Sequence, residues 1–492
     1  MKTIIVSIAL MAAPSAYAQG TACADMAKFQ MSGGSVSITK AGKITDALPA
    51  RCRVDGIIDQ RNGAGGKTYG IGFALALPDS WNGRFLFQGG GGLNGSVQNP
   101  VGAGAAGEAS ALARGFAVVS TDTGHKGSGG FDASFMADQQ ASLDFYYVAV
   151  GRVTLLAKDM IARYYGRPAD HSYFVGCSTG GREAMLMSQR YPTYYDGIVS
   201  GDPAIRTGYS NLALAYMNAA FNQIAPKDPF SDGDRKLVID SIVKSCDEKD
   251  GLKDGLIFNT KACDFNPAAL TCRSAKTESC LSAQQTTSLA RAFAGPKDSH
   301  GNQVYPGFPF DAGIADPAGI AGILISGARS PVNPATASPE FDVDKAAAGL
   351  IANSNANAGD TTWTNLTTFS GHGGKLIFYH GLSDPWFSPL DTVGYYEKMS
   401  RDNGGIDKVK DWSRLFLVPG MGHCSGGAVT VDSFDMLTAI VNWVEKAQAP
   451  DSIVAKGRTQ PVRARPLCAY PLHAQYAGQG DPQDAKSFVC RE

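Results

Sequence analysis

The sequence feature that most constrains the fold of this 492-residue chain is the run Gly176-Cys177-Ser178-Thr179-Gly180. It lies between a short apolar stretch at residues 173–175 and a stretch of helical periodicity at residues 181–191, which ends at Pro192. Small residues around a serine are typical of a sharp strand–turn–helix elbow, which forces an unusual backbone conformation and leaves the hydroxyl exposed above a sheet. The run therefore predicts a nucleophilic serine, with an ordinary strand-end turn as the alternative.

Strands and helices are predicted to alternate on both sides of this elbow. Apolar stretches bounded by glycine or polar turns predict strands at residues 70–77, 84–88, 116–119, 198–203, 375–380 and 415–418. Helical periodicity predicts helices at residues 143–165 and 436–447. This alternation is typical of an α/β fold with a mainly parallel sheet covered on both faces.

Residues 205–365 have a different character. They carry helical patches, Asp/Gly/Lys turns, four cysteines and a Pro/Ala/Ser-rich stretch, but no clear buried strand. We therefore expect an α/β core of residues 19–204 and 366–492, interrupted by this segment, which we call the insertion. Its position beside the site-bearing turns suits a lid.

The N-terminus and the cysteines indicate export. Lys2, an apolar stretch at residues 4–12 and the small-x-small sequence Ala16-Tyr17-Ala18 are typical of a signal peptide spanning residues 1–18, with a buried strand as the alternative. The ten cysteines all follow this segment, and their even number predicts up to five disulfides in an oxidising compartment. We expect a secreted or periplasmic protein.

Charge and composition argue against several classes of partner. The chain has 44 basic and 45 acidic residues and no block of lysine or arginine, so nothing favours nucleic acid or an anionic membrane. No apolar run reaches the roughly 20 residues that a membrane-spanning helix needs. The cysteines form no C-x2-C pair and the histidines are scattered, which argues against a zinc site.

A nucleophilic serine needs a base to remove its proton and an acid to orient that base. In α/β hydrolases these follow the serine in the order acid, then histidine, each on a loop after a later strand. Asp384 and His423 meet this order, because they follow the strands at residues 375–380 and 415–418. Weaker alternatives, further from a strand end or within a strand, are Asp391, His380, His372 and His473.

Two cysteines support this triad independently. Cys177 immediately precedes Ser178, and Cys424 immediately follows His423. If the serine and the histidine touch, these two thiols are close enough to form a disulfide that joins nucleophile to base.

The run Gly-Cys-Ser-Thr-Gly-Gly-Arg at residues 176–182, with Asp384 and the His423-Cys424 pair, resembles the tannase/feruloyl esterase family of α/β hydrolases over nearly the whole mature chain. The resemblance implies the triad Ser178, Asp384 and His423, joined by the Cys177–Cys424 bridge. Sequence alone leaves many connectivities for the other eight cysteines. The resemblance implies the pairs Cys246–Cys263, Cys272–Cys280, Cys468–Cys490 and Cys23–Cys52.

Acyl transfer also needs donors for the developing oxyanion. One is expected from the backbone N–H of Thr179, and the other from the glycines at residues 89–92, where the alternative is a plain flexible loop. We take Gly91 as the donor and Gly90 as the second choice. This chemistry needs no cofactor.

Residues 246–256 in the insertion contain three aspartates separated by glycines, which can wrap a hard cation, although the spacing is not that of an EF-hand. A solvated Asp-Gly turn is the alternative. The resemblance implies a structural calcium ion that stiffens the insertion. Its ligands would be the side chains of Asp247, Asp250 and Asp254 and the carbonyls of Leu252 and Leu256.

The resemblance assigns His380 and Phe387 to the acyl pocket. Trp386 and Trp363 are candidate aromatic walls or core residues, and Arg329 is a candidate partner for a substrate carboxylate or a plain surface residue. We expect a serine esterase acting on small esters of aromatic, phenolic carboxylic acids, because Thr179 resembles the feruloyl esterase branch. The alternatives are a terephthalate-monoester hydrolase, a peptidase, or a non-catalytic calcium-dependent binding protein. The oligomeric state stays open.

Overall fold

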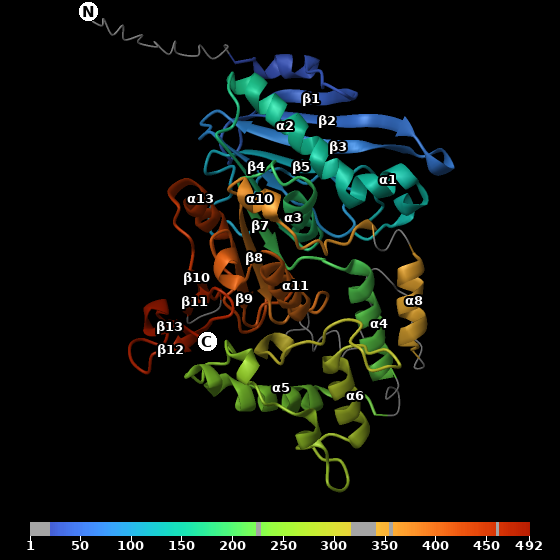
Figure 1. The fold of residues 1–492 in the computed structure, drawn as a ribbon, viewed down its shortest axis with the longest axis vertical. Helices are drawn as coiled ribbons and strands as arrows, with labels where there is room; N and C mark the ends of the chain where they lie inside the picture. Colours follow the sequence, from blue (N-terminus) through green and yellow to red (C-terminus); the bar gives the residue numbers. More distant parts are fainter. Residues whose placement is uncertain (1–19, 223–227, 316–340, 354–357, 459–461) are drawn as a thin grey trace, which may run out of the picture.

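The computed structural model describes residues 20–222, 228–315, 341–353, 358–458 and 462–492 (Figure 1). The expected signal peptide lies outside these residues. Within them, no helix combines the length and the apolar character needed to cross a membrane.

The core of the molecule is a nine-stranded sheet with the strand order β1-β2-β3-β5-β4-β6-β7-β8-β9. The strands from β5 through β9 in this order are parallel, and β1, β2 and β3 pair antiparallel at one edge. The bounds are β1 (Val36–Ile44), β2 (Arg51–Asn62), β3 (Thr68–Pro78), β4 (Arg84–Gln88), β5 (Ala117–Thr121), β6 (His171–Cys177), β7 (Gly197–Gly201), β8 (Lys375–Gly381) and β9 (Ser413–Val418).

The α/β-hydrolase core with a mainly parallel sheet is as predicted, and every predicted strand is present to within a few residues. Strands β1 and β2 were not predicted. They lie at the sheet edge, where β1 has no fully buried residue and many positions are polar, so no apolar run marks β1.

Helices cover the two faces of the sheet. One face packs against α2, α3 and α11 through a cluster that includes Val153, Met185 and Tyr396. The other packs against α13 through Met436 and Ile440. The bounds are α1 (Gln139–Leu143), α2 (Ala149–Tyr165), α3 (Thr179–Arg190), α10 (Thr367–Gly371), α11 (Pro389–Asp402), α12 (Ile406–Val409) and α13 (Met436–Lys446). Short strands β10 (Ser452–Lys456), β11 (Ala464–Cys468), β12 (His473–Tyr476) and β13 (Phe488–Arg491) complete the chain.

The insertion leaves the sheet after β7 and returns before β8. Its helices lie together below the sheet in Figure 1. They have a hydrophobic cluster of their own, which includes Met217, Val238 and Leu289 and no residue of the central sheet. The helices are α4 (Thr207–Asn222), α5 (Asp232–Cys246), α6 (Ala283–Ala294) and α8 (Val343–Ala352).

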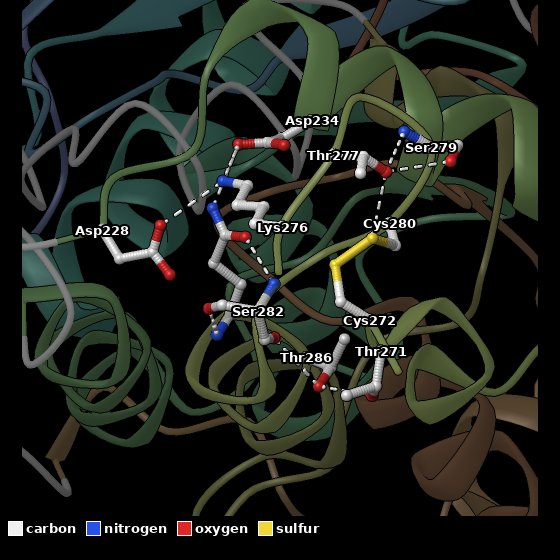
Figure 2. The surroundings of a disulfide bond; sticks show 11 residues. Asp228, Asp234, Thr271, Cys272, Lys276, Thr277, Ser279, Cys280, Ser282 and Thr286 are labelled. Atoms are coloured by element: carbon white, nitrogen blue, oxygen red, sulfur yellow. Dashed lines mark hydrogen bonds and ion pairs between the residues drawn. A yellow bond between two sulfur atoms is a disulfide. The ribbon is translucent and has the colours of Figure 1, made fainter. Parts of the chain in front are cut away.

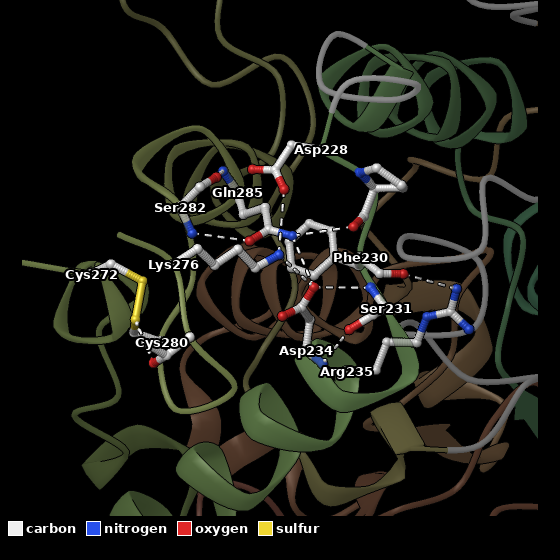
Figure 3. A network of polar contacts seen from close by, with 12 residues as sticks. Asp228, Phe230, Ser231, Asp234, Arg235, Cys272, Lys276, Cys280, Ser282 and Gln285 are labelled. Atoms are coloured by element: carbon white, nitrogen blue, oxygen red, sulfur yellow. Dashed lines mark hydrogen bonds and ion pairs between the residues drawn. A yellow bond between two sulfur atoms is a disulfide. The ribbon is translucent and has the colours of Figure 1, made fainter. Parts of the chain in front are cut away.

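A polar network around the Cys272–Cys280 disulfide holds parts of the insertion together (Figure 2). Lys276, in the loop that this disulfide closes, donates to Asp234 at 2.9 Å and to Asp228 at 3.3 Å. The same Asp234 oxygen accepts from the backbone of Ser231 and from Gln285 (Figure 3). The loop is thereby tied to the starts of α5 and α6.

Candidate active site

Ser178 occupies a strained turn between β6 and α3. Its φ of 64° and ψ of −126° lie in a region that L-residues rarely adopt. Glycines permit the turn, because a Cβ on Gly176 would lie 2.3 Å from the carbonyl oxygen of Gly180, and one on Gly180 would lie 2.6 Å from that of Gly90. The structure thus has the elbow that the sequence predicts.

Asp384 and His423 meet at the carboxyl ends of β8 and β9. His423 Nδ1 lies 2.7 Å from Asp384 Oδ2, and Asp384 Oδ1 accepts the backbone N–H groups of Trp386 and Phe387 at 2.8 and 3.2 Å. Burial disfavours the Asp384 carboxylate, but the charges and hydrogen bonds of His423 and His380 outweigh it and hold the pKa of Asp384 low. Burial also disfavours the His423 imidazolium, but Asp384 outweighs it and raises the pKa of His423.

The Cys177–Cys424 disulfide joins the serine turn to the histidine loop, with its two Cα atoms 5.9 Å apart. The other four disulfides join the pairs that the family resemblance implies: Cys23–Cys52, Cys246–Cys263, Cys272–Cys280 and Cys468–Cys490. Five disulfides are consistent with an oxidising compartment.

Three backbone N–H groups beside Ser178 make no hydrogen bond among the described residues: those of Thr179, Gly91 and Gly92. The N–H of Gly90 differs, because it donates to Glu183 Oε2 at 2.9 Å. The glycine loop is held against the elbow by the bond from the Gly180 N–H to the Gly90 carbonyl, at 3.1 Å. Gly91 therefore fits the expected donor role better than Gly90.

Two cavities meet at Ser178. One, of about 430 Å³, is lined by Ser178, His423, Trp386 and the glycines at residues 89–92. The other is smaller and apolar, with walls from Leu93, Phe131, Leu214, Trp386 and Phe387. In the wall of the smaller cavity, whose free space is about 30 Å³, Phe131 and Trp386 meet edge to face with ring centroids 6.0 Å apart.

The residues predicted to bind substrate divide into three groups. Phe387 and Trp386 line the apolar cavity. His380 is fully buried and lines neither cavity, contrary to the prediction, because its ring bonds inward to Thr392 Oγ1 at 2.8 Å and to the Phe387 carbonyl at 3.0 Å. Trp363 is 63% exposed and lines neither cavity, and Arg329 lies outside the described residues.

The alternative acid, Asp391, lies on α11 and forms an ion pair with Arg206. Among the alternative histidines, His473 lines a separate small cavity near the C-terminal strands, and neither it nor His372 borders the cavities at Ser178.

The acidic loop of the insertion is compact. Asp247 and Asp250 are 5% and 3% exposed, and their carboxylates accept backbone N–H groups from Gly255 and Phe258 at 2.9–3.0 Å. Burial, together with the charge of the neighbouring Asp254 carboxylate, raises the pKa of Asp250 to about 7. Carboxylate oxygens are the type that calcium prefers, but the oxygens of Asp247, Asp250 and Asp254 do not all lie within 4.8 Å of one another, and Asp254 pairs with Arg465.

Sequence reasoning missed four residues at the site. Phe131 lines the apolar cavity, and Glu183 holds the glycine loop. Asp311, in the insertion, accepts Ser383 Oγ and the Gly420 N–H, and Asp202 is buried beside Asp384. Only Asp202 carried a local signal, since it is a polar residue directly after a predicted strand.

Comparison with known proteins identifies the family. The model of the family described as tannase and feruloyl esterase matches residues 52–355 and 331–491. The chain belongs to this family. Its members' names support carboxylic ester hydrolysis as the activity of the chain.

Relatives support the same assignment. The chain is 40% identical to mono(2-hydroxyethyl) terephthalate hydrolase of Piscinibacter sakaiensis, over 90% of this chain and 85% of that protein. It is 29% identical to a probable feruloyl esterase of Arthroderma benhamiae, over 85% and 81%. Among solved structures, feruloyl esterase B of Aspergillus oryzae is 25% identical and superimposes with a TM-score of 0.80, over 95% of this chain and 99% of that one.

Proposed function

We propose that this protein is a secreted serine esterase that hydrolyses esters of aromatic carboxylic acids through an acyl-enzyme. The observation that carries the proposal is the meeting of three features at one cavity. These are the strained Ser178 turn, the His423–Asp384 hydrogen bond, and the disulfide between the neighbours of Ser178 and His423.

In this mechanism Ser178 attacks the ester carbonyl while His423 takes the hydroxyl proton through Nε2. Asp384 accepts a hydrogen bond from the Nδ1–H of His423, which fixes the ring and stabilises its charged form. His423 then protonates the leaving alcohol, activates a water molecule, and the acid is released. The N–H groups of Thr179 and Gly91 stabilise the oxyanion, and each such donor contributes about 10²–10³ in kcat.

The acyl group would occupy the cavity of about 430 Å³ beside Ser178 and extend toward Phe131, Trp386 and Phe387, whose own space of about 30 Å³ would have to widen to admit the ring. Thr207 and Asn211 also line this smaller cavity and offer polar groups to a phenolic hydroxyl, which favours phenolic acids. A second candidate is an aromatic dicarboxylate monoester, favoured by the 40% identity to the terephthalate monoester hydrolase. The insertion would act as the lid over this cavity, because Leu214 of α4 forms part of its wall.

A substrate panel tests the proposal. Purified enzyme is assayed on feruloyl, galloyl, mono-terephthaloyl and short aliphatic esters, and on the amide that matches the best ester. We expect aromatic esters to be hydrolysed fastest, the amide to resist, and Ser178→Ala to lose turnover of every ester. Labelling of wild type but not Ser178→Ala by a fluorophosphonate would exclude a non-catalytic binding protein. An enzyme that turns over esters without Ser178 would contradict the mechanism.

We also propose a structural calcium ion in the insertion. Asp247, Asp250 and Asp254 would supply side-chain ligands, and Leu252 and Leu256 would supply carbonyls. Support comes from the burial of Asp247 and Asp250, which among the described residues have no ion-pair partner. The ion would compensate these buried charges and would take no part in the reaction.

Removal of calcium should therefore lower stability more than chemistry. Because an ion bound only by the folded state stabilises by mass action, a concentration 100-fold above Kd contributes about 2.7 kcal/mol. We expect a chelator to lower the Tm and Asp250→Asn to lose this chelator response, with kcat retained at low temperature. A melting curve unmoved by chelator, in protein shown to be metal-free, would contradict the site.

A further inference from the structure

Asp202 is a buried carboxyl group to which the mechanism above gives no role. It directly follows β7, the strand next to the nucleophile strand β6, and its side chain is fully buried. Its φ is 36°, which is unusual for a residue other than glycine. Its N–H donates to the Tyr379 carbonyl at 2.9 Å, and its Oδ1 accepts the Gly381 N–H at 2.8 Å. These contacts with β8 hold the carboxyl group at the edge of the sheet that carries the site.

The Asp202 carboxyl group lies beside the base as well as the acid. One oxygen of Asp202, one oxygen of Asp384 and one nitrogen of His423 lie within 4.8 Å of one another. The other side of the carboxyl group contacts the active-site disulfide, with Oδ2 3.3 Å from Cys177 Sγ. The strand order explains the arrangement, because β7 and β8 are adjacent and parallel. Asp202 directly follows β7, and Asp384 lies in the turn that follows β8.

His380 joins the two carboxyl groups. Its Nε2 lies 3.3 Å from Asp384 Oδ2 and 3.6 Å from Asp202 Oδ1. Burial disfavours the His380 imidazolium, but the two carboxylates outweigh it and raise its pKa. Burial raises the pKa of Asp202 to about 6. Asp202 is thus a buried acid whose negative charge acts on the imidazole rings of both His380 and His423.

Other charged groups near this cluster are few among the described residues. The Tyr379 hydroxyl is close enough for Asp202 to raise its pKa. The charge of His380 also acts on Asp391, but Asp391 forms an ion pair with Arg206. The charges that act on His423 are therefore those of Asp384 and Asp202, with His380 behind them.

We propose that Asp202 is a second carboxylate of the His423 site, a positioning residue whose charge stabilises the His423 imidazolium and which accepts a hydrogen bond from His423 Nδ1–H when Asp384 is absent. The inference rests on the proposed triad. A carboxylate within 4.8 Å favours the imidazolium that forms when Ser178 gives up its proton, through its charge and without the hydrogen bond that Asp384 makes.

The pH dependence of kcat/KM tests the charge of Asp202. Asp202→Asn keeps the shape of the side chain and an acceptor for the Gly381 N–H, but removes the charge. His423 then protonates at lower pH, so the ratio of kcat/KM at pH 6.5, where Asp202 of the wild type still carries most of its charge, to that at pH 8.5 should rise at least about threefold. Asp144→Asn, which removes a buried carboxyl group remote from His423, should keep the wild-type ratio. An unchanged ratio in folded Asp202→Asn would overturn the inference, even if its Tm falls.

A double variant tests the second half of the inference without relying on the pH profile. Asp384→Ala removes the usual acceptor, and Asp384→Ala/Asp202→Asn removes both. We expect the double variant to lose about 10-fold more kcat/KM than Asp384→Ala, because its histidine has no acid left. Equal activities of the single and double variants would overturn the inference. Full activity of Ser178→Ala would instead overturn the proposed function, so the two failures are distinguishable.

Discussion

At the scale of single residues, Glu183 links the nucleophile helix to the oxyanion loop. It is fully buried on α3, where Oε2 accepts the Gly90 N–H at 2.9 Å and Oε1 accepts from Asn94 Nδ2 at 2.7 Å. These bonds turn the Gly90 N–H away from substrate and leave that of Gly91 available. Glu183 therefore acts on the oxyanion through the loop and does not touch it.

Glu183→Ala should lower kcat by roughly 10²-fold, because a loop that moves loses one oxyanion donor. Glu183→Gln should retain most activity. Its amide oxygen can accept the Gly90 N–H, and its amide nitrogen can donate to Asn94 Oδ1, which has no hydrogen-bond partner among the described residues. Steady-state kinetics with Tm measurements separate the two variants. Equal damage in both would mean that the charge of Glu183 matters more than its geometry.

Phe387 carries the second prediction at this scale. It lines the apolar cavity, and its backbone N–H also supports Asp384. Phe387→Ala keeps the N–H and removes the ring, so kcat/KM should fall for aromatic esters by about 1–3 kcal/mol, roughly 10-fold or more. A short aliphatic ester should be much less affected. Equal losses on both substrates would assign Phe387 to support of Asp384.

The sequence predicts residues whose chemistry is marked by their neighbours. Ser178 lies between glycines, and Asp384 and His423 directly follow apolar strands, so each has a local pattern. Glu183 and Asp311 have none, because their roles arise from contacts with loops 89 and 109 residues away in sequence. The prediction for His380 was wrong because its closeness to Asp384 in sequence does not show where its ring lies. The ring is buried behind Asp384 and lines neither cavity at Ser178.

At the scale of elements, the insertion holds the loops of the acid and the base. Asp311, fully buried, accepts Ser383 Oγ at 2.5 Å and the Gly420 N–H at 2.7 Å. Ser383 precedes Asp384, and Gly420 belongs to the loop that carries His423. Tyr305 accepts the Ser388 N–H at 3.1 Å and adds a third contact. Loss of structure in the insertion would therefore remove contacts that hold the loops of Asp384 and His423 in place.

The Lys276 network should accordingly contribute to stability. Lys276→Met leaves Asp234, which is 4% exposed, without its cation. Because Lys276 is itself 34% exposed, solvent screening reduces the effect, and we expect a loss of about 1–2 kcal/mol in the free energy of unfolding.

The matched control for this measurement is Lys236→Met. It removes an ion pair with Asp240 in which both side chains are mostly exposed, so chemical denaturation should detect almost no change. Equal losses in the two variants would indicate that Asp234 is satisfied by Ser231 and Gln285 without Lys276.

At the scale of the whole molecule, the site is assembled from segments that lie far apart in sequence. The glycine loop, Ser178, Asp202, Asp384 and the His423 loop all follow the carboxyl ends of neighbouring parallel strands. That edge is where open α/β sheets bind ligands. Strand order therefore places the groups near one another, and the disulfide between residues 247 apart fixes the final distance between nucleophile and base.

The Cys177–Cys424 bridge should thus support activity and stability together. Replacing both cysteines by alanine opens a long loop in the unfolded chain, which suggests a cost of about 2–5 kcal/mol, and also releases the Ser178 turn from the His423 loop. We expect a lower Tm and a lower kcat/KM, even at temperatures where the variant is fully folded. Replacing Cys23 and Cys52 provides the control, because that bridge joins the N-terminal segment to β2, outside the parallel strands that carry the site, and its loss should leave kcat/KM nearly unchanged. Wild-type kcat/KM in the folded Cys177/Cys424 variant would mean that the sheet alone positions the serine and the histidine.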